Sequence, residues 1–418
     1  MSAILISGGR RLEGAVHIHG AKNSVLPILA ATILSGSVSV IHNCPPLSDV
    51  AASVSILEHL GCRVTREGDT ITVDSGPLDR CDIPEHLMRE MRSSVIFLGA
   101  VLARTGEARL SMPGGCELGP RPIDLHLSAL RRLGAEIDEA GGGLKCRTRG
   151  LRGAEISFTI PSVGATENAM LAACGARGRT VLYNAAREPE IWDLQQFLNA
   201  CGARIQGAGS SVITIEGQVP LHMAEHRVIS DRICAATYLS AAALTGGEIE
   251  VEGVPRRQLV LITDLFSLAG CQVREEAQRI WLTSDGQLRG VPPVRTAPYP
   301  GFPTDAQPPV MAALTRARGT TVFVETIFEN RYRHTQELAR MGADIRVEGR
   351  VAVVCGVPRL HGARLEAADL RGGAALVVAA LGAEGESRIT GLHHLDRGYA
   401  DLTGHLSALG AQIRREEP

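Results

Sequence analysis

A five-residue pattern recurs six times along the chain: an apolar or small residue, glycine, a small residue, any residue, then valine or isoleucine. The copies begin at Leu60, Leu133, Cys201, Ala269, Met341 and Leu409. Their glycines are 73, 68, 68, 72 and 68 residues apart. A spacing this regular indicates one supersecondary unit copied six times. Residues that do not follow the repeat are therefore where chemistry should be sought.

The second copy shows what one unit is expected to contain. Residues 122–133 place apolar side chains near helical spacing, and Pro122 suits the first turn, where its missing N–H costs nothing. Gly134 suits the left-handed residue that ends a helix. Residues 135–137 then predict a strand, a run of glycines predicts a turn, and residues 144–146 predict a returning strand. Each unit is thus helix, strand, turn and strand.

A second helix, rich in alanine and glycine, precedes the next copy, and its small residues predict close packing inside the protein. Such stretches begin at Ala30, Ala169, Ala235 and Gly373. A chain of 418 residues is too long for one ordinary core. Six units divide naturally into two α/β domains of three units each, joined near Arg227–Asp231.

Composition narrows the class of protein. The chain is 44% hydrophobic and 21% charged with a net charge of −2, which is typical of a soluble globular protein. Aromatic residues are only 3% and no basic run contains them, which argues against a nucleic-acid surface. The apolar stretches 93–103 and 372–383 are shorter than the roughly 20 residues of a membrane span. Ten cysteines without C-x-x-C spacing, and no signal peptide, predict a cytoplasmic location.

Nearly all basic residues of the chain are arginines, and very few are lysines. Of 43 basic residues only Lys22 and Lys145 are lysines, and Lys22 directly precedes the apolar run 25–34. Lys22 is therefore a candidate functional residue, with a surface lysine as the alternative.

Arginines recur shortly before the first helix of most units. They are Arg121, Arg187, Arg256 or Arg257, Arg331 and Arg397, while the first unit has Ser48 there. Helix N-termini favour anions, and guanidinium groups strengthen that preference. The pattern predicts a site for an anionic ligand, and local capping or packing of each arginine is the alternative.

Three irregular segments break the repeat. The loop 113–121 contains Cys116 among glycines and prolines, where Arg121 and a helix start would lower the pKa of the thiol; a buried, inert cysteine is the alternative. The proline-rich segment 292–309 holds Asp305 in a stiff loop, where a surface turn is the alternative. Residues 162–166 precede a small-residue helix and suit a phosphate, although without the lysine of a P-loop.

Histidine spacing gives little support for a metal site. His222 and His226 are four residues apart without a plausible third ligand, and His393 and His394 are adjacent. We assign both pairs to structure or solvent and expect no metal.

Together these segments resemble the enolpyruvyl transferases, in particular the branch that acts on UDP-N-acetylglucosamine. The matching stretches, in family order, are 20–23, 113–126, 161–166, 185–190, 295–305, 325–331, 369–371 and 396–399. The resemblance implies two inside-out α/β barrel domains, each of three repeated units. It places the hinges near Ala21 and Ser230, so that one domain spans 22–229 and the other 1–21 with 230–418. It also implies an active site in the cleft between them, and no cofactor.

The resemblance assigns a reaction and roles. The enolpyruvyl group of phosphoenolpyruvate would move to the 3-hydroxyl of UDP-N-acetylglucosamine through a tetrahedral intermediate, with Asp305 as base and Cys116 as the candidate general acid. Residues implied at phosphoenolpyruvate are Lys22, Asn23, Arg121 and Arg397, with Arg331 and Arg371 on its carboxylate. Residues implied at the UDP-sugar are Arg92, Arg121, Pro122, Ile123, Asp124, Leu125, Ser162, Val163, Gly164, Asp305 and Ile327.

One departure from the family and three rival functions stay open. Ile160 stands where some relatives carry lysine beside the nucleotide phosphates. A transferase acting on shikimate 3-phosphate would keep the repeats but has no need of the Cys116 loop. A silent sensor of UDP-sugars would have no need of Lys22, Cys116 and Asp305 together. A bare repeat scaffold for protein partners leaves the arginines unexplained.

Overall fold

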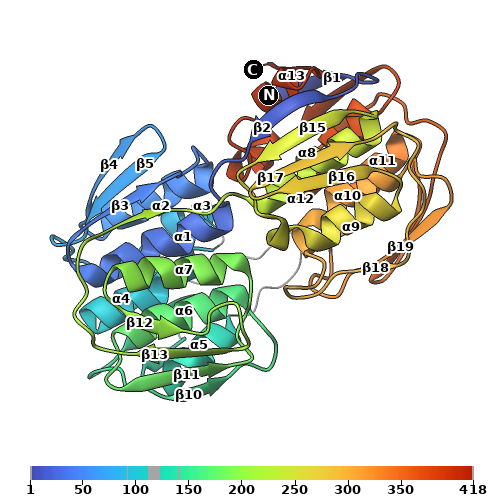
Figure 1. The fold of residues 1–418 in the computed structure, drawn as a ribbon. Helices are drawn as coiled ribbons and strands as arrows, with labels where there is room; N and C mark the ends of the chain where they lie inside the picture. Colours follow the sequence, from blue (N-terminus) through green and yellow to red (C-terminus); the bar gives the residue numbers. More distant parts are fainter. Residues whose placement is uncertain (1, 92, 112–122, 140–141, 417–418) are drawn as a thin grey trace. The chain divides into compact units, whose positions relative to one another are not determined.

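The structure, a computed structural model, describes residues 2–91, 93–111, 123–139 and 142–416. These residues form two compact units. We call the described residues from Gly20 to Ile229 the central unit, and residues 2–19 with 230–416 the terminal unit, because the latter is built from both ends of the chain (Figure 1). Four residues singled out in the sequence lie outside the described residues. They are Arg92, Cys116, Arg121 and Pro122.

Each unit contains three copies of one motif, and each copy supplies a sheet of four strands. In the described part of the chain every sheet has the same order: a parallel edge strand, a second strand, an inner antiparallel strand and an antiparallel edge strand. The parallel pairs are β14 (Ala224–Arg227) with β3 (Val38–His42), β6 (Asp82–Ile83) with β7 (Glu107–Ser111), β10 (Glu155–Ser157) with β11 (Arg179–Tyr183), β2 (Glu13–His17) with β15 (Glu248–Glu252), β18 (Val294–Arg295) with β19 (Thr320–Val324), and β22 (Arg364–Glu366) with β23 (Glu386–Thr390).

The other two strands of each sheet are antiparallel to their neighbours. The inner strands, in the same order, are β5 (Thr70–Asp74), β9 (Gly143–Arg147), β13 (Val212–Glu216), β17 (Arg279–Thr283), β21 (Val351–Cys355) and β1 (Ala3–Ser7). The edge strands are β4 (Arg63–Glu67), β8 (Glu136–Asp138), β12 (Arg204–Gln206), β16 (Gln272–Glu276), β20 (Asp344–Glu348) and β24 (Gln412–Glu416).

Two helices accompany each sheet. The first of each pair is α1 (Lys22–Ala31), α4 (Phe97–Thr105), α6 (Val163–Cys174), α8 (Arg232–Thr245), α10 (Gln307–Leu314) or α12 (Leu370–Leu381). The second is α2 (Ser48–His59), α5 (Asp124–Arg132), α7 (Pro189–Ala200), α9 (Val260–Leu268), α11 (His334–Arg340) or α13 (Leu402–Ala408). The remaining short helices are α3 (Glu85–Glu90), η1 (Thr32–Ser35), η2 (Ser94–Ile96), η4 (Arg256–Gln258), η5 (Thr304–Ala306) and η6 (Leu392–Arg397).

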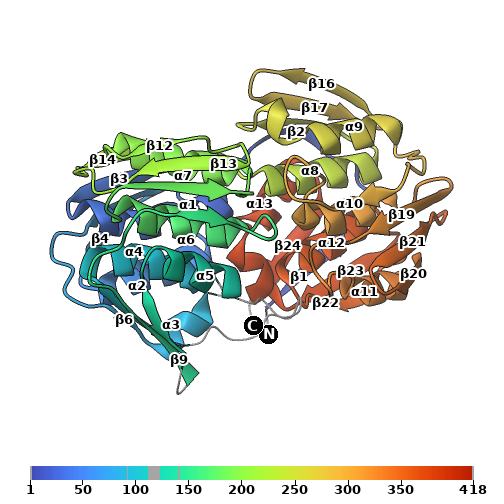
Figure 2. The ribbon, with the colours of Figure 1, turned by 90° about the horizontal axis from the view of Figure 1, so that it is seen from below.

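Helices lie inside each unit and sheets lie outside. In the terminal unit α8, α10 and α12 contact one another, and nearly all their residues are buried (Figure 2). Strands such as β11 and β13 alternate buried with exposed positions, so one face packs on the helices and the other faces solvent. The predicted small-residue stretches indeed lie in buried helices, because alanine and glycine let helix backbones approach closely.

The six repeat glycines each end the second helix of a copy. Their φ angles lie between 93° and 107°, in the left-handed region that favours glycine. The strand that follows each glycine is the antiparallel edge strand of its sheet. The predicted order of helix, glycine and strand is therefore confirmed in all six copies.

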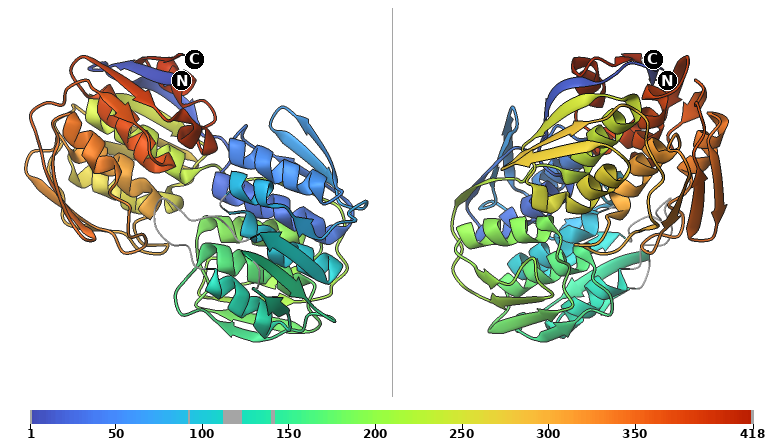
Figure 3. Two further views of the ribbon diagram at one scale, coloured as in Figure 1. Left: turned by 180° about the vertical axis from the view of Figure 1, so that it is seen from behind. Right: turned by 45° about the vertical axis from the view of Figure 1, so that its right-hand side comes forward.

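The sixth copy differs from the expected motif in its last strand. β24 has no hairpin partner after it in the described chain; it pairs instead with β1 from the N-terminus, which also pairs with β23. β2 likewise joins β15 in the fourth sheet. Figure 3 shows both labelled ends of the chain in the terminal unit. In the central unit, β14 returns to pair with β3 in the first sheet.

The proline-rich segment is also more ordered than expected. Pro308 and Pro309 lie in the first turn of α10, where a missing backbone N–H breaks no helical hydrogen bond. The irregular segment that contains Asp305 therefore ends at η5. None of the helices in the described ranges combines the length and the hydropathy that a membrane span requires.

Candidate active site

Lys22 begins α1 in the central unit and makes a close ion pair. Its Nζ lies 2.8 Å from Oδ2 of Asp49, in the first turn of α2. The Asp49 side chain is buried and that of Lys22 is 12% exposed. A carboxylate in the first turn of a helix is stabilised by the helix dipole, and the ammonium compensates its burial. Sequence reasoning missed Asp49, although an acid at the helix start that lacks the recurring arginine was a usable signal.

A second buried acid, Asp193 of α7, holds the chain on both sides of Lys22. Its carboxylate accepts hydrogen bonds from the Ser24 hydroxyl and from the backbone N–H of Ile229 at 3.2 Å. His226 Nε2 lies 2.9 Å from its other oxygen. The backbone N–H of Ala21 also donates to the Ile229 carbonyl, at 2.7 Å. His226 thus has a structural partner, in line with its assignment from sequence.

The first turns of α5 and α6 bring together two of the predicted UDP-sugar segments, 123–125 and 162–164. Ser162 caps α6 by accepting a hydrogen bond from the Ala165 N–H at 3.4 Å. A Cβ atom on Gly164 would lie 3.0 Å from Cε1 of His126 in α5, so the two helices approach closely here and a larger residue would have to displace the imidazole. The exposed Ile160 precedes the capped turn.

His126 is held neutral between these helices. Burial lowers its pKa to about 4, which the nearby Asp124 only partly offsets. The amide nitrogen of Asn168 lies 2.8 Å from His126 Nδ1, so that ring nitrogen accepts and the proton is assigned to Nε2. Asn168 also accepts from the Gly99 N–H at 2.6 Å. This network joins α4, α5 and α6.

In the terminal unit three predicted residues from distant parts of the sequence meet. Arg331 Nη2 donates to Oδ1 of Asp305 at 2.8 Å, and Arg371 Nε donates to Oδ2 at 3.4 Å. The side chains of Arg331 and Arg371 are 1% and 3% exposed, while that of Asp305 is 29% exposed. Two arginine side chains thus hold the Asp305 carboxylate, whereas its part in the reaction stays a prediction.

Arg371 has further hydrogen-bonding capacity. Its Nη1 is buried and has no hydrogen-bond partner in the described part of the chain. Burial acts to lower the pKa of its guanidinium, but acidic neighbours outweigh burial and hold the pKa well above the usual value. Burial also raises the pKa of Tyr399 and Cys234, which leaves both neutral at pH 7, so Asp305 and Asp231 supply the negative charge. Such a nitrogen suits an incoming carboxylate.

The segment around Arg397 packs near Arg371. The Tyr399 ring lies with its centroid 5.5 Å from the Arg371 guanidinium carbon, and its hydroxyl lies 2.8 Å from Thr237 Oγ1. Arg397 itself is half-buried at the end of η6. Asp369 caps α12 by accepting from the backbone N–H groups of Arg371 and Gly372.

The expected gathering of the helix-start arginines is only partly met. Arg331 joins Asp305, but Arg256 forms an ion pair with Glu275 of the neighbouring strand β16, and Arg187 and Arg257 are exposed. Arg256 lies on the short helix η4, beside a strand that already offers a carboxylate, so local pairing is favoured. For Arg256 the alternative interpretation, a local role instead of ligand binding, was correct.

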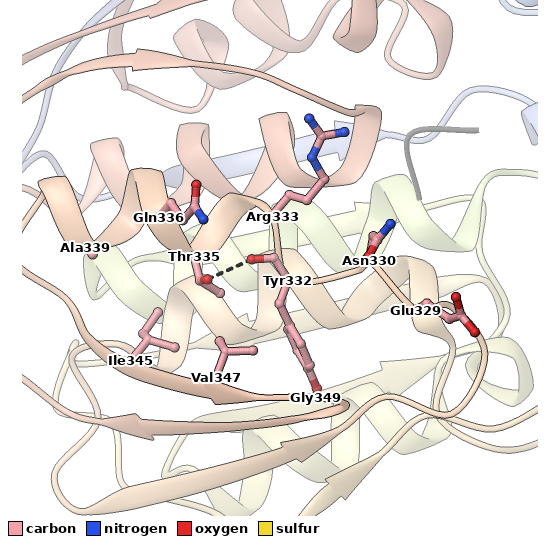
Figure 4. Close-up of a pocket in the computed structure, with 10 residues that line it drawn as sticks. All are labelled: Glu329, Asn330, Tyr332, Arg333, Thr335, Gln336, Ala339, Ile345, Val347 and Gly349. Carbon is pink, nitrogen blue, oxygen red and sulfur yellow. Dashed lines mark hydrogen bonds between the residues drawn. The ribbon is translucent and has the colours of Figure 1, made fainter. Parts of the chain in front are cut away.

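A surface pocket of about 440 Å³ lies elsewhere on the terminal unit. Figure 4 shows it between α11 and β20, with Arg333 and Gln336 above Ile345 and Val347. The Tyr332 side chain beside it is held by its hydroxyl, which donates to the backbone oxygens of Phe323 and Arg350. None of the predicted site residues lines this pocket. Among the described residues no group of three or more His, Cys, Asp or Glu side chains is arranged to hold a metal ion.

Comparison with known proteins identifies the family. A family model described as EPSP synthase (3-phosphoshikimate 1-carboxyvinyltransferase) matches residues 6–406. The chain belongs to the EPSP synthase family. Within this family, the chain is 52% identical to UDP-N-acetylglucosamine 1-carboxyvinyltransferase 2 of Caldanaerobacter subterraneus subsp. tengcongensis, over 99% of this chain and 100% of the relative. It is 46% identical to the UDP-N-acetylglucosamine 1-carboxyvinyltransferase of Nitratidesulfovibrio vulgaris, over 100% of both chains.

Two solved structures share the fold of this chain. The enolpyruvyl transferase NikO from Streptomyces tendae matches with a TM-score of 0.89 and 29% identity, covering 100% of this chain and 99% of that one. An EPSP synthase from Acinetobacter baumannii matches with a TM-score of 0.77 at 18% identity, over 100% of both chains, which supports the fold alone. These likenesses confirm the predicted fold class of two inside-out α/β domains built from three repeated units each.

Proposed function

We propose that this chain transfers the enolpyruvyl group of phosphoenolpyruvate to the 3-hydroxyl of UDP-N-acetylglucosamine, the first committed step of peptidoglycan synthesis. Relatives that are 46–52% identical over nearly the whole chain carry the name of this transferase. The observation in the structure that supports the proposal best is the Asp305 carboxylate between two buried arginines, one of which keeps a buried nitrogen without a partner among the described residues.

The reaction is an addition followed by an elimination. The sugar oxygen bonds to C2 of phosphoenolpyruvate while C3 gains a proton, which gives a tetrahedral intermediate. C3 then loses a proton as the C2–O bond to phosphate breaks, so the double bond returns and inorganic phosphate leaves. The steps need one base near the sugar hydroxyl, one acid near C3 and cations around the phosphate and the carboxylate.

Asp305 and its arginines suit the sugar hydroxyl and the carboxylate. Asp305 is the more exposed member of the group and can accept the hydroxyl proton. Arg331 and Arg371 bind the carboxylate of phosphoenolpyruvate, since a guanidinium can form paired hydrogen bonds with a carboxylate. The buried Nη1 of Arg371 provides one donor without breaking its bond to Asp305.

The remaining charges act at the phosphate and at C3. We assign Lys22, Asn23, Arg121 and Arg397 to the phosphate, and Cys116 to proton transfer at C3. Asp49 keeps the Lys22 ammonium at the start of α1, where the free N–H groups of the helix also favour an anion.

The first turns of α5 and α6 are proposed to bind the UDP-sugar. Their residues are Ile123, Asp124, Leu125, Ser162, Val163 and Gly164, with Arg92, Arg121, Pro122 and Ile327. The exposed Ile160 supplies no charge to the diphosphate, which places more of that role on arginines and helix N–H groups.

We propose that the residues of both units act on one pair of substrates. The two domains would be 22–229 and 1–21 plus 230–418, and the active site would lie in a cleft between them. The nine cysteines in the described ranges are free, which fits a reducing cytoplasm.

The decisive experiment measures phosphate release from phosphoenolpyruvate by the purified full-length chain. We expect release that requires UDP-N-acetylglucosamine and does not occur with shikimate 3-phosphate. Release with shikimate 3-phosphate alone would favour the 3-phosphoshikimate 1-carboxyvinyltransferase activity after which the family is named. No release with either acceptor, together with binding of UDP-N-acetylglucosamine, would favour a silent sensor.

A variant pair tests the role of Asp305 in the same assay. Asp305→Asn should lower kcat by about 10²–10⁴-fold, because general base catalysis contributes that much. Asp264→Asn, an exposed acid on α9 of the same unit, is the matched control and should keep wild-type turnover. Comparable activity in both variants would contradict the assignment.

A further inference from the structure

Glu325 is a buried carboxylate that the proposed chemistry does not use. It directly follows β19 and its side chain is almost completely inaccessible. Oε1 accepts hydrogen bonds from the backbone N–H groups of Ile327 at 2.7 Å and Phe328 at 3.0 Å. Oε2 accepts a hydrogen bond from the hydroxyl of Thr304 at 3.0 Å. Three hydrogen bonds from two separate loops therefore meet on this one side chain.

Thr304 connects Glu325 to the proposed base. It is the residue before Asp305, and its carbonyl accepts hydrogen bonds from Arg331 Nε at 3.1 Å and Nη2 at 2.9 Å. The same Nη2 donates to Asp305 at 2.8 Å. Thr304 therefore uses its hydroxyl toward Glu325 and its carbonyl toward Arg331. A displacement of Thr304 would move the Asp305 carboxylate and its arginine partner together.

The other loop held by Glu325 carries Ile327. The neighbouring Thr326 is fixed from a different side, since its N–H and hydroxyl bond to the side chain and backbone of Thr296. Glu325 is thus a direct side-chain link between the loop of Ile327 and the residue before Asp305, in addition to Thr296, which anchors the Ile327 loop to the end of β18. The two loops are 20 or more residues apart in sequence, so local chain geometry alone cannot keep them in register.

We propose that Glu325 is a positioning residue for this reaction. It holds Thr304, and through it the Asp305 carboxylate, at a fixed place relative to the backbone of Ile327, so that base and sugar contact stay aligned. The inference rests on the proposed function, in which Asp305 takes the proton from the sugar hydroxyl and Ile327 touches the sugar. Misplacing a reacting group by about 1 Å can cost about 10²-fold in rate, which sets the size of the effect.

Three single variants and one double variant of the chain test this role. Glu325→Ala should lower kcat by about 100-fold. Glu325→Gln should stay within about threefold of wild type, because its carbonyl can accept both N–H groups and its amide can donate to Thr304. Thr304→Val should lower kcat by about tenfold. The double variant Glu325→Ala/Thr304→Val should be no slower than Glu325→Ala, because both changes remove one shared interaction.

The KM for phosphoenolpyruvate distinguishes a positioning role of Glu325 from a general disruption of the active-site structure. The KM for phosphoenolpyruvate should change by less than about threefold in Glu325→Gln and Thr304→Val, since both variants keep the backbone carbonyl at position 304 to which Arg331 donates, and Arg371 has no bond to Glu325 or Thr304 among those described above. Glu348→Ala, an exposed acid on β20, serves as the matched control and should retain wild-type kcat and KM. Melting temperature and far-UV circular dichroism establish which variants are folded.

The outcomes distinguish this inference from the proposed function. A wild-type chain that releases no phosphate with UDP-N-acetylglucosamine rejects the function itself. With an active wild type, a folded Glu325→Ala at normal kcat overturns the inference. A Glu325→Gln as slow as Glu325→Ala would mean that charge matters and not geometry, which also overturns it. If Glu325→Ala fails to fold, Thr304→Val decides, and normal turnover in that variant rejects the role.

Discussion

Glu167 is a buried acid of the central unit whose surroundings raise its pKa. It lies in the first turns of α6, and one of its carboxyl oxygens is buried without a hydrogen-bond partner in the described ranges. Burial, and then the charges of Glu190 and Glu188, hold its pKa well above the usual 4.5. Asp49 and Asp193, by contrast, have cationic or N–H partners.

A neutral replacement of Glu167 should stabilise the central unit. A raised pKa contributes stability that is fully present below about pH 4.5 and is lost as the pH rises, because only the unfolded chain releases the proton readily. Glu167→Gln removes that loss, so its melting temperature should exceed that of wild type at pH 8, with a smaller difference at pH 5. Equal melting temperatures at both pH values would show that Glu167 is ionised in the folded protein.

Cysteine reactivity is the second prediction at the level of single residues. Burial raises the pKa of eight of the nine described cysteines, to about 11 for Cys62 and to about 12 for Cys44. The ninth, Cys355, is half-buried. An epoxide of the fosfomycin type should therefore alkylate Cys116 and no other thiol, because thiolate is the reactive form.

Peptide mapping by mass spectrometry checks the site of alkylation. Cys355→Ser should leave the extent of labelling unchanged, whereas Cys116→Ser should abolish it. Adduct on Cys355 in the wild type would mean that accessibility, and not the pKa of the thiol, decides which cysteine reacts.

At the level of helices and strands, local patterns predicted far more than long-range pairing did. The helix, glycine and strand order was predictable because a left-handed glycine and apolar periodicity act within a few residues. The two-residue strands β6 and β18 left no such pattern, since their pairing depends on the neighbouring strand. The partner of β24 was missed for the same reason, because β1 lies at the opposite end of the sequence.

Two glycines test what the left-handed conformation costs by itself. Gly134 and Gly207 have φ angles of 94° and 96°, but a Cβ atom on Gly134 meets nothing within 4 Å, whereas one on Gly207 would lie 2.1 Å from the Val212 carbonyl oxygen. Gly134→Ala should cost about 1 kcal/mol of unfolding free energy from the backbone conformation alone. Gly207→Ala should cost about 3 kcal/mol, since overpacking adds to that strain.

Intrinsic fluorescence can report these losses for one unit at a time. The chain has two tryptophans, Trp192 in α7 of the central unit and Trp281 in β17 of the terminal unit. Urea unfolding in a Trp281→Phe background therefore follows the central unit, where both glycines lie. Equal losses for the two alanine variants would contradict the steric argument.

On the scale of the whole molecule, each unit contains one histidine that is buried and neutral. Burial lowers the pKa of His126 and of His334 from 6.5 to about 4. The unfolded chain binds the proton more readily, so the contribution of each histidine is complete above pH 6.5 and is lost as the pH falls toward 4. The free energy of unfolding of each unit should therefore decrease by about 3 kcal/mol between pH 6.5 and pH 4.

Replacing one histidine should remove the acid sensitivity of its own unit. In the Trp281→Phe background, we compare the free energy of unfolding at pH 6.5 and at pH 4. Its decrease between these pH values should be about 3 kcal/mol smaller in His126→Gln than with His126 present. His334→Gln should leave that decrease unchanged and reduce the one followed by Trp281 in a Trp192→Phe background. An unchanged slope in both backgrounds would mean that these histidines are protonated in the folded units.

The sequence allowed a set of site residues to be proposed, but it did not predict their geometry. Gly and Pro content marked the segments of Cys116 and Asp305 as loops, and family resemblance supplied the roles. The pairing of Asp305 with Arg371 joins residues 66 positions apart, and Lys22 with Asp49 joins the starts of two helices. Such contacts arise from how the copies pack, which spacing along one chain does not reveal.

The placement of β1 and β2 has a consequence for synthesis on the ribosome. Both strands are synthesised before their partners, and in the described chain β1 pairs with β23 and β24, which are made several hundred residues later. At about 5–20 residues per second, roughly 20–80 s pass before those partners are made. The central unit is complete much earlier, so it can fold while the N-terminal segment still waits as an unpaired, apolar stretch. A chaperone that binds nascent chains would find its main client segment in the first 20 residues of this protein.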